Sequence, residues 1–571
     1  MKHIRLSFVL IFLLAAGVRA TLLWEPINTF SWREADLASM ARNYEQEGMN
    51  LFYPRIDWRG TGPGYTEVEF PLYAWSAAVL FQIFGYHEFI LRLMVYALSL
   101  VGMWMFFKLA RYLLPDVGAL AATLFYALSP LAVFISTAVQ AEGLMFCCYV
   151  TAFYAFVRWI DEHSRFHYWL AVGATSLAIL TKSPAAHLGV AFALIVLTRA
   201  GWKALRDPAV WTFGVVALLP ALLWYRYAHQ FWLGYGNSMG LSNEYHWIGR
   251  DFFTNPSFIK NIVRMELFRV WMPTGVVIAA LGVWFRWSDR AVRYALFWLL
   301  AVVMFYVIGA RTTGDDWAFY YHLFSVAPVA LLVGAGTEVI SSIPVTDRML
   351  KAALAISLAL IVVSLLAWLA AVSFIHLGGE EKWLPRLAVL FALVAAACAG
   401  WRALRRAESL NEVTTNPGWM KAALGYGLVV TLCATLLFQV RGIAKEVLER
   451  PTGLYACVPA FSAALTEPGL ILASGGACHD PDGYQVAYNA SYFFYWLKRK
   501  GFNVCETEQS LPAIRSFAER GARYFVAEKQ ALRKQPGFEA DLRRTYPVVS
   551  ECAEAVLFQL TASHEQNAGR K

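Results

Sequence analysis

Residues 30–43 (FSWREADLASMARN) form a charged and aromatic stretch that follows an apolar run, residues 5–24 (RLSFVLIFLLAAGVRATLLW). The apolar run is long enough to cross the roughly 30 Å of bilayer hydrocarbon. The charged stretch begins a polar loop of about sixty residues, which is far longer than most connections between packed elements. We therefore expect a membrane anchor followed by a large functional loop at the membrane surface.

The composition of the whole chain supports a membrane protein. Of its 571 residues, 58% are hydrophobic and 16% are charged, and the mean hydropathy is +0.47. Ordinary soluble domains carry about 25% charged residues, so this excess of apolar residues indicates a polytopic α-helical protein. The net charge of +9 is explained by basic cytoplasmic loops. No zinc-finger spacing or basic repeat indicates a nucleic-acid partner.

Thirteen apolar runs are candidate membrane spans, two of them short. They cover residues 5–24, 87–107, 117–136, 143–160, 167–181, 184–199, 209–229, 272–286, 293–309, 320–340, 351–375, 383–401 and 421–440. The run 71–84 is apolar but brief, and we interpret it as an amphipathic helix on the membrane surface. The sequence thus predicts a transmembrane module over residues 1–440, with an outer loop at 25–87.

Charge asymmetry between the loops predicts the orientation. With a cytoplasmic N-terminus, every second loop is rich in Lys and Arg, while the opposite loops are acidic or mixed. The first run resembles a signal peptide, but the many later spans favour an uncleaved helix whose Arg19 snorkels to the interface. An odd number of spans then places the tail outside the cytosol. We expect a multi-pass protein of the bacterial inner membrane with a periplasmic C-terminal domain.

The tail, residues 441–571, regains charged residues and reads as a small α/β domain. Strand patterns cover residues 470–473, 524–527 and 555–559, and helical patterns cover 491–500 and 511–520. Four cysteines lie here: Cys457, Cys478, Cys505 and Cys552. Outside the cytosol they can form two disulfides in any of three pairings, and unpaired thiols are an equal alternative. The favoured role of the domain is packing or guiding an acceptor.

Several charged residues fall on the predicted outer face. The carboxylates are Glu34, Asp36, Glu69 and Glu142, and the cations are Arg33, Lys182 and Arg311. A lipid phosphate needs cationic partners and an acceptor hydroxyl needs a base, so one cavity holding both suits lipid-linked glycosyl transfer. Two structural alternatives stay open. Residues 33–36 can belong to a solvated helix with routine ion pairs, and Lys182 can be a snorkelling side chain. Near Arg311, His322 is a further weak signal, and the aromatic belt alone accounts for Tyr320 and Tyr321.

These features together resemble the GT-C glycosyltransferases. The first span ending in Arg, the helix at 32–43, the segment 69–73 (EFPLY), Lys182 after the fifth span and the Tyr320–Tyr321 pair are similar to the dolichyl-phosphate-mannose protein mannosyltransferase superfamily, which includes aminoarabinose lipid A transferases and related lipopolysaccharide glycosyltransferases. The resemblance covers roughly residues 1–340. It implies a polyprenyl-phosphate sugar as donor, and a lipid, glycan or protein as acceptor.

The resemblance also implies roles for individual residues. Family members carry an acidic pair in the first outer loop, most often Asp-Glu, whereas this chain has Arg33-Glu34 followed by Asp36. The base is therefore Asp36 or Glu34; we favour Asp36, with Glu69 and Glu142 at the second and third acidic positions. Lys182 with Arg33 or Arg311 would bind the donor phosphate. The remaining positioning residues would be Tyr320, Tyr321 and His322.

Two further questions stay open at this stage. Clustered carboxylates suit a divalent cation such as Mg²⁺ or Mn²⁺, although no ligand spacing requires one. A transporter or flippase of lipid-linked glycans is the alternative function. Transporters commonly show inverted repeats and helices broken at the midplane, whereas this chain has no repeat and its charges collect at one face.

Overall fold

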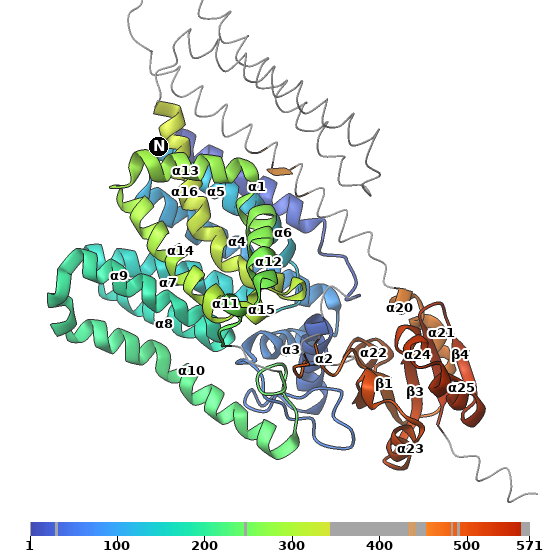
Figure 1. Cartoon of the computed structure of the whole chain (residues 1–571). Helices are drawn as coiled ribbons and strands as arrows, with labels where there is room; N and C mark the ends of the chain where they lie inside the picture. The colour runs from blue at the N-terminus through green and yellow to red at the C-terminus, as the bar shows by residue number, and fades with distance from the viewer. Residues whose placement is uncertain are drawn as a thin grey trace, which may run out of the picture. The chain divides into compact units, whose positions relative to one another are not determined.

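The computed structural model describes residues 2–28, 32–244, 248–342, 453–480, 483–487 and 491–560, together with residues 433, 436, 437 and 440. All but residues 338–342 of this set belong to one compact unit, made of residues 1–337 and 429–571. Within it, a helical membrane module, an outer loop with two helices and a C-terminal sheet domain follow one another along the chain (Figure 1).

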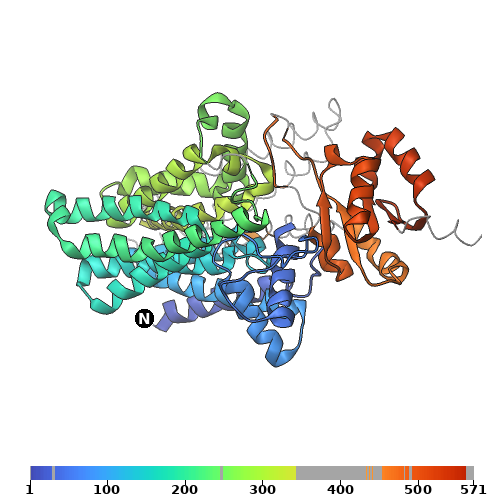
Figure 2. The same ribbon diagram turned by 90° about the horizontal axis from the view of Figure 1, so that it is seen from below.

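Long apolar helices build the membrane module. They are α1 (Lys2–Ala20), α4 (Glu88–Leu113), α5 (Asp116–Leu128), α6 (Pro130–Ile135), α7 (Glu142–Glu162), α8 (Arg165–Thr181), α9 (Leu188–Ala200), α10 (Pro208–Tyr235), α12 (Pro256–Met265), α13 (Pro273–Arg286), α14 (Arg290–Ile308) and α16 (Leu323–Ser342). Short helical segments join them: η1 (Ser183–His187), η2 (Gly201–Arg206), α11 (Asp251–Thr254), η3 (Glu266–Trp271), α15 (Ala310–Thr313) and η4 (Asp316–His322). Figure 2 shows the same helices from below.

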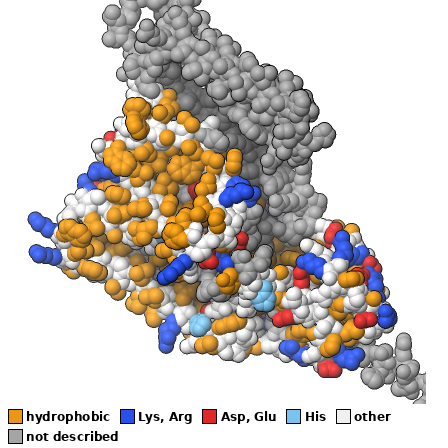
Figure 3. All heavy atoms as spheres, in the orientation of Figure 1, with side chains coloured by type: hydrophobic (Ala, Val, Ile, Leu, Met, Phe, Trp, Pro, Cys, Tyr) orange, Lys and Arg blue, Asp and Glu red, His pale blue; other side chains and the backbone are white. Residues whose placement is uncertain are grey.

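Six helical segments among the described residues are long and apolar enough to cross a membrane. They are Glu88–Leu113, Glu142–Glu162, Ser183–Arg206, Pro208–Tyr235, Arg290–Ile308 and Ala318–Ser342. A seventh exists if Pro256–Trp271 and Thr274–Arg286, which meet at 88°, form one broken span. Figure 3 shows hydrophobic side chains spread over the surface of this module, as expected for helices that face lipid.

The predicted apolar runs up to residue 340 are helical over most of their length, but α1 and α8 are not among the segments that qualify as spans. Helix α12 lies in none of the predicted runs, and one run is broken. The run 117–136 is divided, because α5 ends at Leu128 and α6 begins at Pro130, and proline cannot continue a helix through its own position without losing a hydrogen bond. The runs 351–375 and 383–401, and all but four residues of 421–440, lie outside the described residues. The count of thirteen spans and the domain boundary near residue 440 therefore stay predictions.

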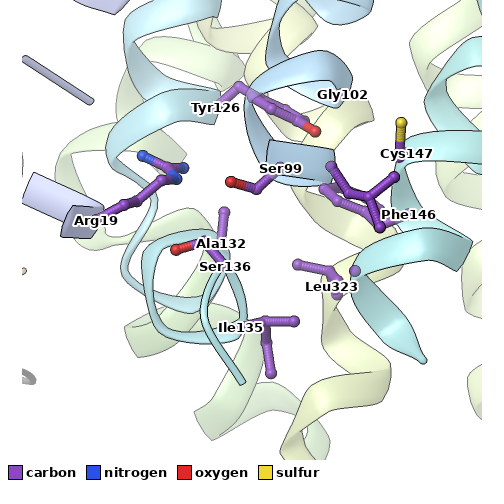
Figure 4. Close-up of a pocket in the computed structure, with 12 residues that line it drawn as sticks. Arg19, Ser99, Gly102, Tyr126, Ala132, Ile135, Ser136, Phe146, Cys147 and Leu323 are labelled. Atoms are coloured by element: carbon purple, nitrogen blue, oxygen red, sulfur yellow. The ribbon is translucent and has the colours of Figure 1, made fainter. Parts of the chain in front are cut away.

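Arg19, at the end of α1, does not reach the interface as expected. Its side chain is buried, with 1% exposed, and its Nη1 donates to Ala15 O at 3.3 Å. It lines a small cavity of about 20 Å³ among α1, α4, α5, α6 and α7, together with Ser99, Tyr126 and Ser136 (Figure 4). A cavity of this size holds about one water molecule. The snorkelling prediction is therefore wrong, and Arg19 instead faces polar groups inside the module.

The outer loop carries α2 (Trp32–Glu47) and α3 (Leu72–Phe84). The helix predicted at 71–84 is confirmed, and its exposed side chains include Ile83 and Phe84. In contrast, α2 is buried from Arg33 to Tyr44. The alternative that its charges sit on a solvated surface helix is therefore wrong, and each of them must be satisfied inside the protein.

The C-terminal domain is a five-stranded mixed sheet in the order β2-β1-β3-β5-β4. Its strands are β1 (Leu470–Ser474), β2 (Gly501–Val504), β3 (Ala522–Glu528), β4 (Val548–Glu551) and β5 (Ala555–Gln559). Its helices are α20 (Gly453–Ala456), α21 (Val458–Ala464), α22 (Ser491–Leu497), α23 (Leu511–Glu519), α24 (Lys529–Lys534) and α25 (Pro536–Thr545), with a short turn η6 (Glu506–Glu508). The predicted strands and helices are confirmed, while β2, β4, α24 and α25 were not predicted. Two disulfides, Cys457–Cys552 and Cys478–Cys505, select one of the three pairings.

Helix α22 joins the sheet domain to the outer loop. Trp496 Nε1 donates to Ile27 O at 2.6 Å, and Ser491 Oγ donates to Trp32 O at 2.9 Å. Buried side chains of α2, α3, α22, β1 and β3 form one hydrophobic cluster. The outer loop also hydrogen-bonds to the first residue of the edge strand β2, because Gly501 N donates to Asp57 O at 3.1 Å and Gly60 N donates to Gly501 O at 2.6 Å. The loop and the sheet domain therefore share a core.

Candidate functional site

Four charged side chains meet inside the protein, and we call Arg33, Glu69, Glu142 and Lys182 the charge cluster. Arg33 Nη1 donates to both oxygens of Glu69, at 3.0 and 3.1 Å. Lys182 Nζ lies 3.3 Å from Glu69 Oε1 and 2.7 Å from Glu142 Oε1. All four side chains are at most 7% exposed. Buried charges of this kind are costly unless paired, and here each cation has an anion.

Distant parts of the chain supply the cluster, and local structure holds each of them. Arg33 lies in the first turn of α2, Glu142 begins α7, and Lys182 follows the last residue of α8. Phe70 N donates to Leu180 O at 3.0 Å, which fixes the Glu69 segment beside the end of α8. Glu142 also gains from the positive end of the α7 dipole.

Two aromatic rings complete the surroundings of Lys182. Its Nζ lies 5.0 Å from the centre of the Tyr320 ring and 5.1 Å from that of Tyr321. Cations are attracted to aromatic faces at such distances. The snorkelling alternative for Lys182 is wrong, because its side chain is 2% exposed. The structure thus brings together six of the predicted residues: Arg33, Glu69, Glu142, Lys182, Tyr320 and Tyr321.

The electrostatics of the cluster make Glu69 a poor base. Burial by itself acts to raise the pKa of Glu69, but Arg33 and Lys182 outweigh burial and lower the pKa to about 2. A carboxylate with so low a pKa accepts a proton weakly. Its evident chemical role is to hold two cations side by side.

Asp36 lies one turn beyond Arg33 on α2 and has different neighbours. Trp58 Nε1 donates to Asp36 Oδ1 at 2.8 Å, and Oδ2 has no hydrogen-bond partner. Burial raises the pKa of Asp36 to about 8, against the opposing effect of the Trp58 hydrogen bond. The nearby Asp57 acts in the same direction as burial. Asp36 is therefore outside the charge cluster, but it is a carboxylate whose pKa lies near neutral pH.

Glu34 connects the outer loop to the helices of the membrane module. Its Oε1 accepts from Val139 N at 2.7 Å and from Arg92 Nη1 at 3.2 Å. Arg92 also donates to the carbonyl oxygens of Glu25, Pro26 and Thr137. Glu34 is thus committed to holding this junction.

The two remaining predicted residues lie in other networks. Arg311 pairs with Asp480 of the sheet domain and with Asp251 at 3.6 Å, and its guanidinium lies 4.3 Å from the Tyr484 ring centre. His322 Nδ1 lies 2.6 Å from Glu266 Oε1, and its Nε2 lies 2.9 Å from Thr313 O.

The sequence did not single out two acidic residues near the cluster. Glu67 accepts from Ser238 Oγ at 2.7 Å and lies 2.9 Å from His229 Nδ1. A side chain added at Gly240 would meet Glu244 Oε2 at 3.1 Å and Arg33 Nη2 at 3.5 Å, so Glu244 lies beside Arg33. Burial raises the pKa of Glu244 to about 7. The spacing of Glu67 and Glu69 was the available signal for Glu67, because residues two apart lie on the same side of an extended chain.

Metal-binding groups are scarce in the described part of the chain. The one group of side chains close enough to share an ion is Cys478, Cys505 and Glu508, and its two cysteines form a disulfide. In the charge cluster, Glu69 and Glu142 share an ammonium in place of a metal ion. The described carboxylates therefore provide no evident divalent-cation site.

Comparison with known proteins bears on this geometry. Residues 68–225 match the family model described as dolichyl-phosphate-mannose-protein mannosyltransferase. The predicted resemblance is confirmed. The matched region contains Glu69, Glu142 and Lys182 of the charge cluster, and Arg33 precedes it. A search of curated proteins finds no match.

Solved structures show the same fold over the whole chain. The structure of ArnT from Cupriavidus metallidurans bound to undecaprenyl phosphate has a TM-score of 0.56 and 17% identity, covering 97% of this chain and 98% of that one. The apo structure of the same protein has a TM-score of 0.57 and 16% identity, covering 98% and 99%. The chain therefore has the fold of ArnT.

Proposed function

We propose that this protein is an integral-membrane glycosyltransferase that uses a polyprenyl-phosphate sugar as donor. The charge cluster carries the proposal, because its two cations are held side by side by buried carboxylates near the outer loop. Such a pair suits the phosphate of a lipid-linked sugar. The family match and the fold shared with ArnT, whose structure is bound to undecaprenyl phosphate, support this donor class.

The proposed reaction is an inverting displacement at the anomeric carbon. The acceptor hydroxyl oxygen forms a bond to this carbon while the bond from the carbon to the phosphate oxygen breaks. The hydroxyl proton passes to a carboxylate, and the polyprenyl phosphate leaves with one additional negative charge. Lys182 and Arg33 stabilise that charge, in the way that fixed cations stabilise developing anions.

Asp36 is the proposed base. Its pKa of about 8 is close to the operating pH, where general bases are most effective, and Oδ2 has no competing hydrogen bond. Glu69 has a pKa of about 2, and Glu34 is occupied by Arg92 and Val139. Glu142, Tyr320 and Tyr321 would position the sugar beside Lys182.

The proposed setting is the periplasmic face of a bacterial inner membrane, with the sheet domain on the same side. The positive-inside distribution of Lys and Arg supports this orientation. The acceptor would be a lipid, a glycan or a protein at that face, and lipopolysaccharide is one member of that set.

Transfer by the purified protein tests the proposal. The full chain in nanodiscs would be incubated with a panel of polyprenyl-phosphate sugars, and release of polyprenyl phosphate would be measured. We expect release with at least one sugar, and its loss in Lys182→Met. Lys108→Met is the matched control, because Lys108 also lies over aromatic rings, those of Trp104 and Tyr154, but outside the cluster. Equal release by both variants would contradict the role of Lys182.

A further inference from the structure

A second candidate site lies between the outer loop, the end of α10 and the sheet domain. It is a cavity of about 430 Å³, within the range of roughly 300–1,000 Å³ typical of small-molecule sites. The outer loop, the C-terminal end of α10, the following turn and the sheet domain all contribute to its wall. None of the residues predicted from the sequence to carry chemistry lines it.

Aromatic side chains form much of the wall: Trp58, Trp232, Tyr235, Phe502 and Phe517. Amide side chains are interspersed with them, from Asn237, Asn243, Gln485 and Asn503. Aromatic faces pack against the apolar C–H faces of sugar rings, while each amide offers both donors and an acceptor to hydroxyl groups. Two of these amides are held by the protein, because Asn237 Nδ2 donates to Tyr65 O at 3.1 Å and Asn243 Oδ1 accepts from Gly240 N at 2.8 Å. Their remaining polar atoms suit hydroxyl groups better than an acyl chain.

The charge of the wall is also specific. Two arginines line the cavity, Arg59 and Arg520, and no Asp or Glu does. Arg59 donates to both oxygens of Glu47 at 2.9 Å, so Arg520 is the main source of positive charge in the wall. The Arg520 guanidinium lies 4.5 Å from the centre of the Phe502 ring and 5.2 Å from that of Phe517. The wall is therefore suited to hydroxyl-rich ligands that are neutral or negatively charged.

The outer-loop side of the cavity is held in place by contacts of Trp58 and Gly60. Trp58 is held by its hydrogen bond to Asp36, at 2.8 Å. Gly60, which has a φ of +59°, lies against the Phe502 ring, and a Cβ at this position would come within 2.4 Å of it. Glycine is thus required for the outer loop to approach the sheet domain so closely.

The cavity adjoins the charge cluster through two elements. In the turn after α10, Asn237 lines the cavity while Met239 O accepts from Arg33 Nη2 at 2.9 Å. On α2, Arg33 faces the cluster while Asp36, one turn later, holds the cavity residue Trp58. A ligand in the cavity would therefore contact Trp58, which donates to the buried proposed base Asp36.

We propose that this cavity binds the acceptor, and that the acceptor is a carbohydrate. This inference rests on the proposed function, since it names the acceptor class of that reaction. The sheet domain then has a chemical role, because Phe502, Asn503 and Phe517 supply one wall of the acceptor site.

Direct binding tests the inference separately from catalysis. The full chain in nanodiscs would be titrated by calorimetry with a neutral oligosaccharide, an oligosaccharide containing uronic acids, and a Ser/Thr-containing peptide. We expect both oligosaccharides to bind, the acidic one more tightly, and the peptide not to bind. Binding of the peptide alone would overturn the inference.

Variants locate the binding. Trp232→Leu and Phe517→Leu should each weaken oligosaccharide binding about tenfold, which corresponds to about 1.4 kcal/mol, since each removes an aromatic face from the wall. Gln485→Ala should weaken oligosaccharide binding less, and it leaves packing intact because Gln485 is exposed. Trp202→Leu is the control, because Trp202 is 78% exposed and does not line the cavity. Equal binding by all four would overturn the inference.

The two proposals fail in different ways. Oligosaccharide binding without transfer from any polyprenyl-phosphate sugar would support the cavity and overturn the glycosyltransferase. Transfer without oligosaccharide binding, and with Trp232→Leu as active as Trp202→Leu, would support the glycosyltransferase and overturn the carbohydrate site.

Discussion

The ammonium of Lys182 lies 2.7 Å from Glu142 Oε1, and both side chains are 2% exposed. The pair neutralises charge inside the protein, and the proposed function gives Lys182 a second, separable role as a cation for the donor phosphate. Lys182→Met should lower the free energy of unfolding by about 3–5 kcal/mol, since it leaves a buried carboxylate without its partner. Thermal unfolding in detergent measures this loss.

A double variant separates stability from binding. Lys182→Met combined with Glu142→Gln removes both charges, so most of the lost stability should return, as it does when whole buried ion pairs are replaced. Affinity for polyprenyl phosphate should not return. If the double variant binds polyprenyl phosphate like the wild type, Lys182 is a structural residue only.

Conservative amide variants distinguish Glu34 from Asp36. Glu34→Gln keeps an oxygen to accept from Val139 N and loses the charge facing Arg92, so it should reduce stability by about 1–3 kcal/mol with transfer within a few-fold of wild type. Asp36→Asn should fold and reduce transfer about 10²–10⁴-fold. Initial rates and unfolding temperatures of both variants check the two expectations together. The reverse pattern would assign the base to Glu34.

The two disulfides should stabilise the sheet domain unequally. Cys457–Cys552 spans 95 residues and Cys478–Cys505 spans 27, so loop-closure entropy predicts about 5 and about 3.5 kcal/mol respectively. Paired Cys→Ser variants, Cys457→Ser with Cys552→Ser and Cys478→Ser with Cys505→Ser, should rank in this order by protease sensitivity of the domain. Equal sensitivity of the two double variants would show that chain entropy does not decide the effect.

Local patterns in the sequence predicted most helices and strands. They did not predict contacts between residues that lie far apart in the sequence. Apolar run length predicted most helices up to residue 340, and β-branched and aromatic runs predicted β1, β3 and β5, because these signals are local. The strand β2 was missed because its four residues, Gly501–Val504, include glycine and asparagine, which are depleted in strands. Its place beside β1 and the outer loop is set by tertiary contacts.

Six predicted site residues meet at one place, as expected from the prediction that they share one face of the membrane. The hydrogen-bond and ion-pair partners of the predicted residues could not be predicted. Nothing in the spacing of residues 33–36 shows that Arg33 faces Glu69, Glu34 faces Arg92 and Asp36 faces Trp58. Consecutive positions of a helix point in different directions, so three neighbouring charges enter three separate networks. The cavity was missed for the same reason, because it is lined by aromatic and amide residues from four distant segments.

Asp36 should make both the activity and the stability depend on pH, with opposite signs. A base must be deprotonated, so the rate of transfer should rise as pH passes through about 8 and level off above it. The folded protein holds this proton with a pKa of about 8, against an ordinary value of 3.8. Between these values the folded state binds more protons than the unfolded state, so stability should fall as pH rises.

Asp36→Asn should remove the fall, and become more stable than the wild type at pH 9. Unfolding temperatures of both proteins from pH 5 to 9 measure this, with Asp57 left intact in each. A wild-type curve that keeps the same offset from Asp36→Asn at every pH would contradict a protonated Asp36 in the folded protein.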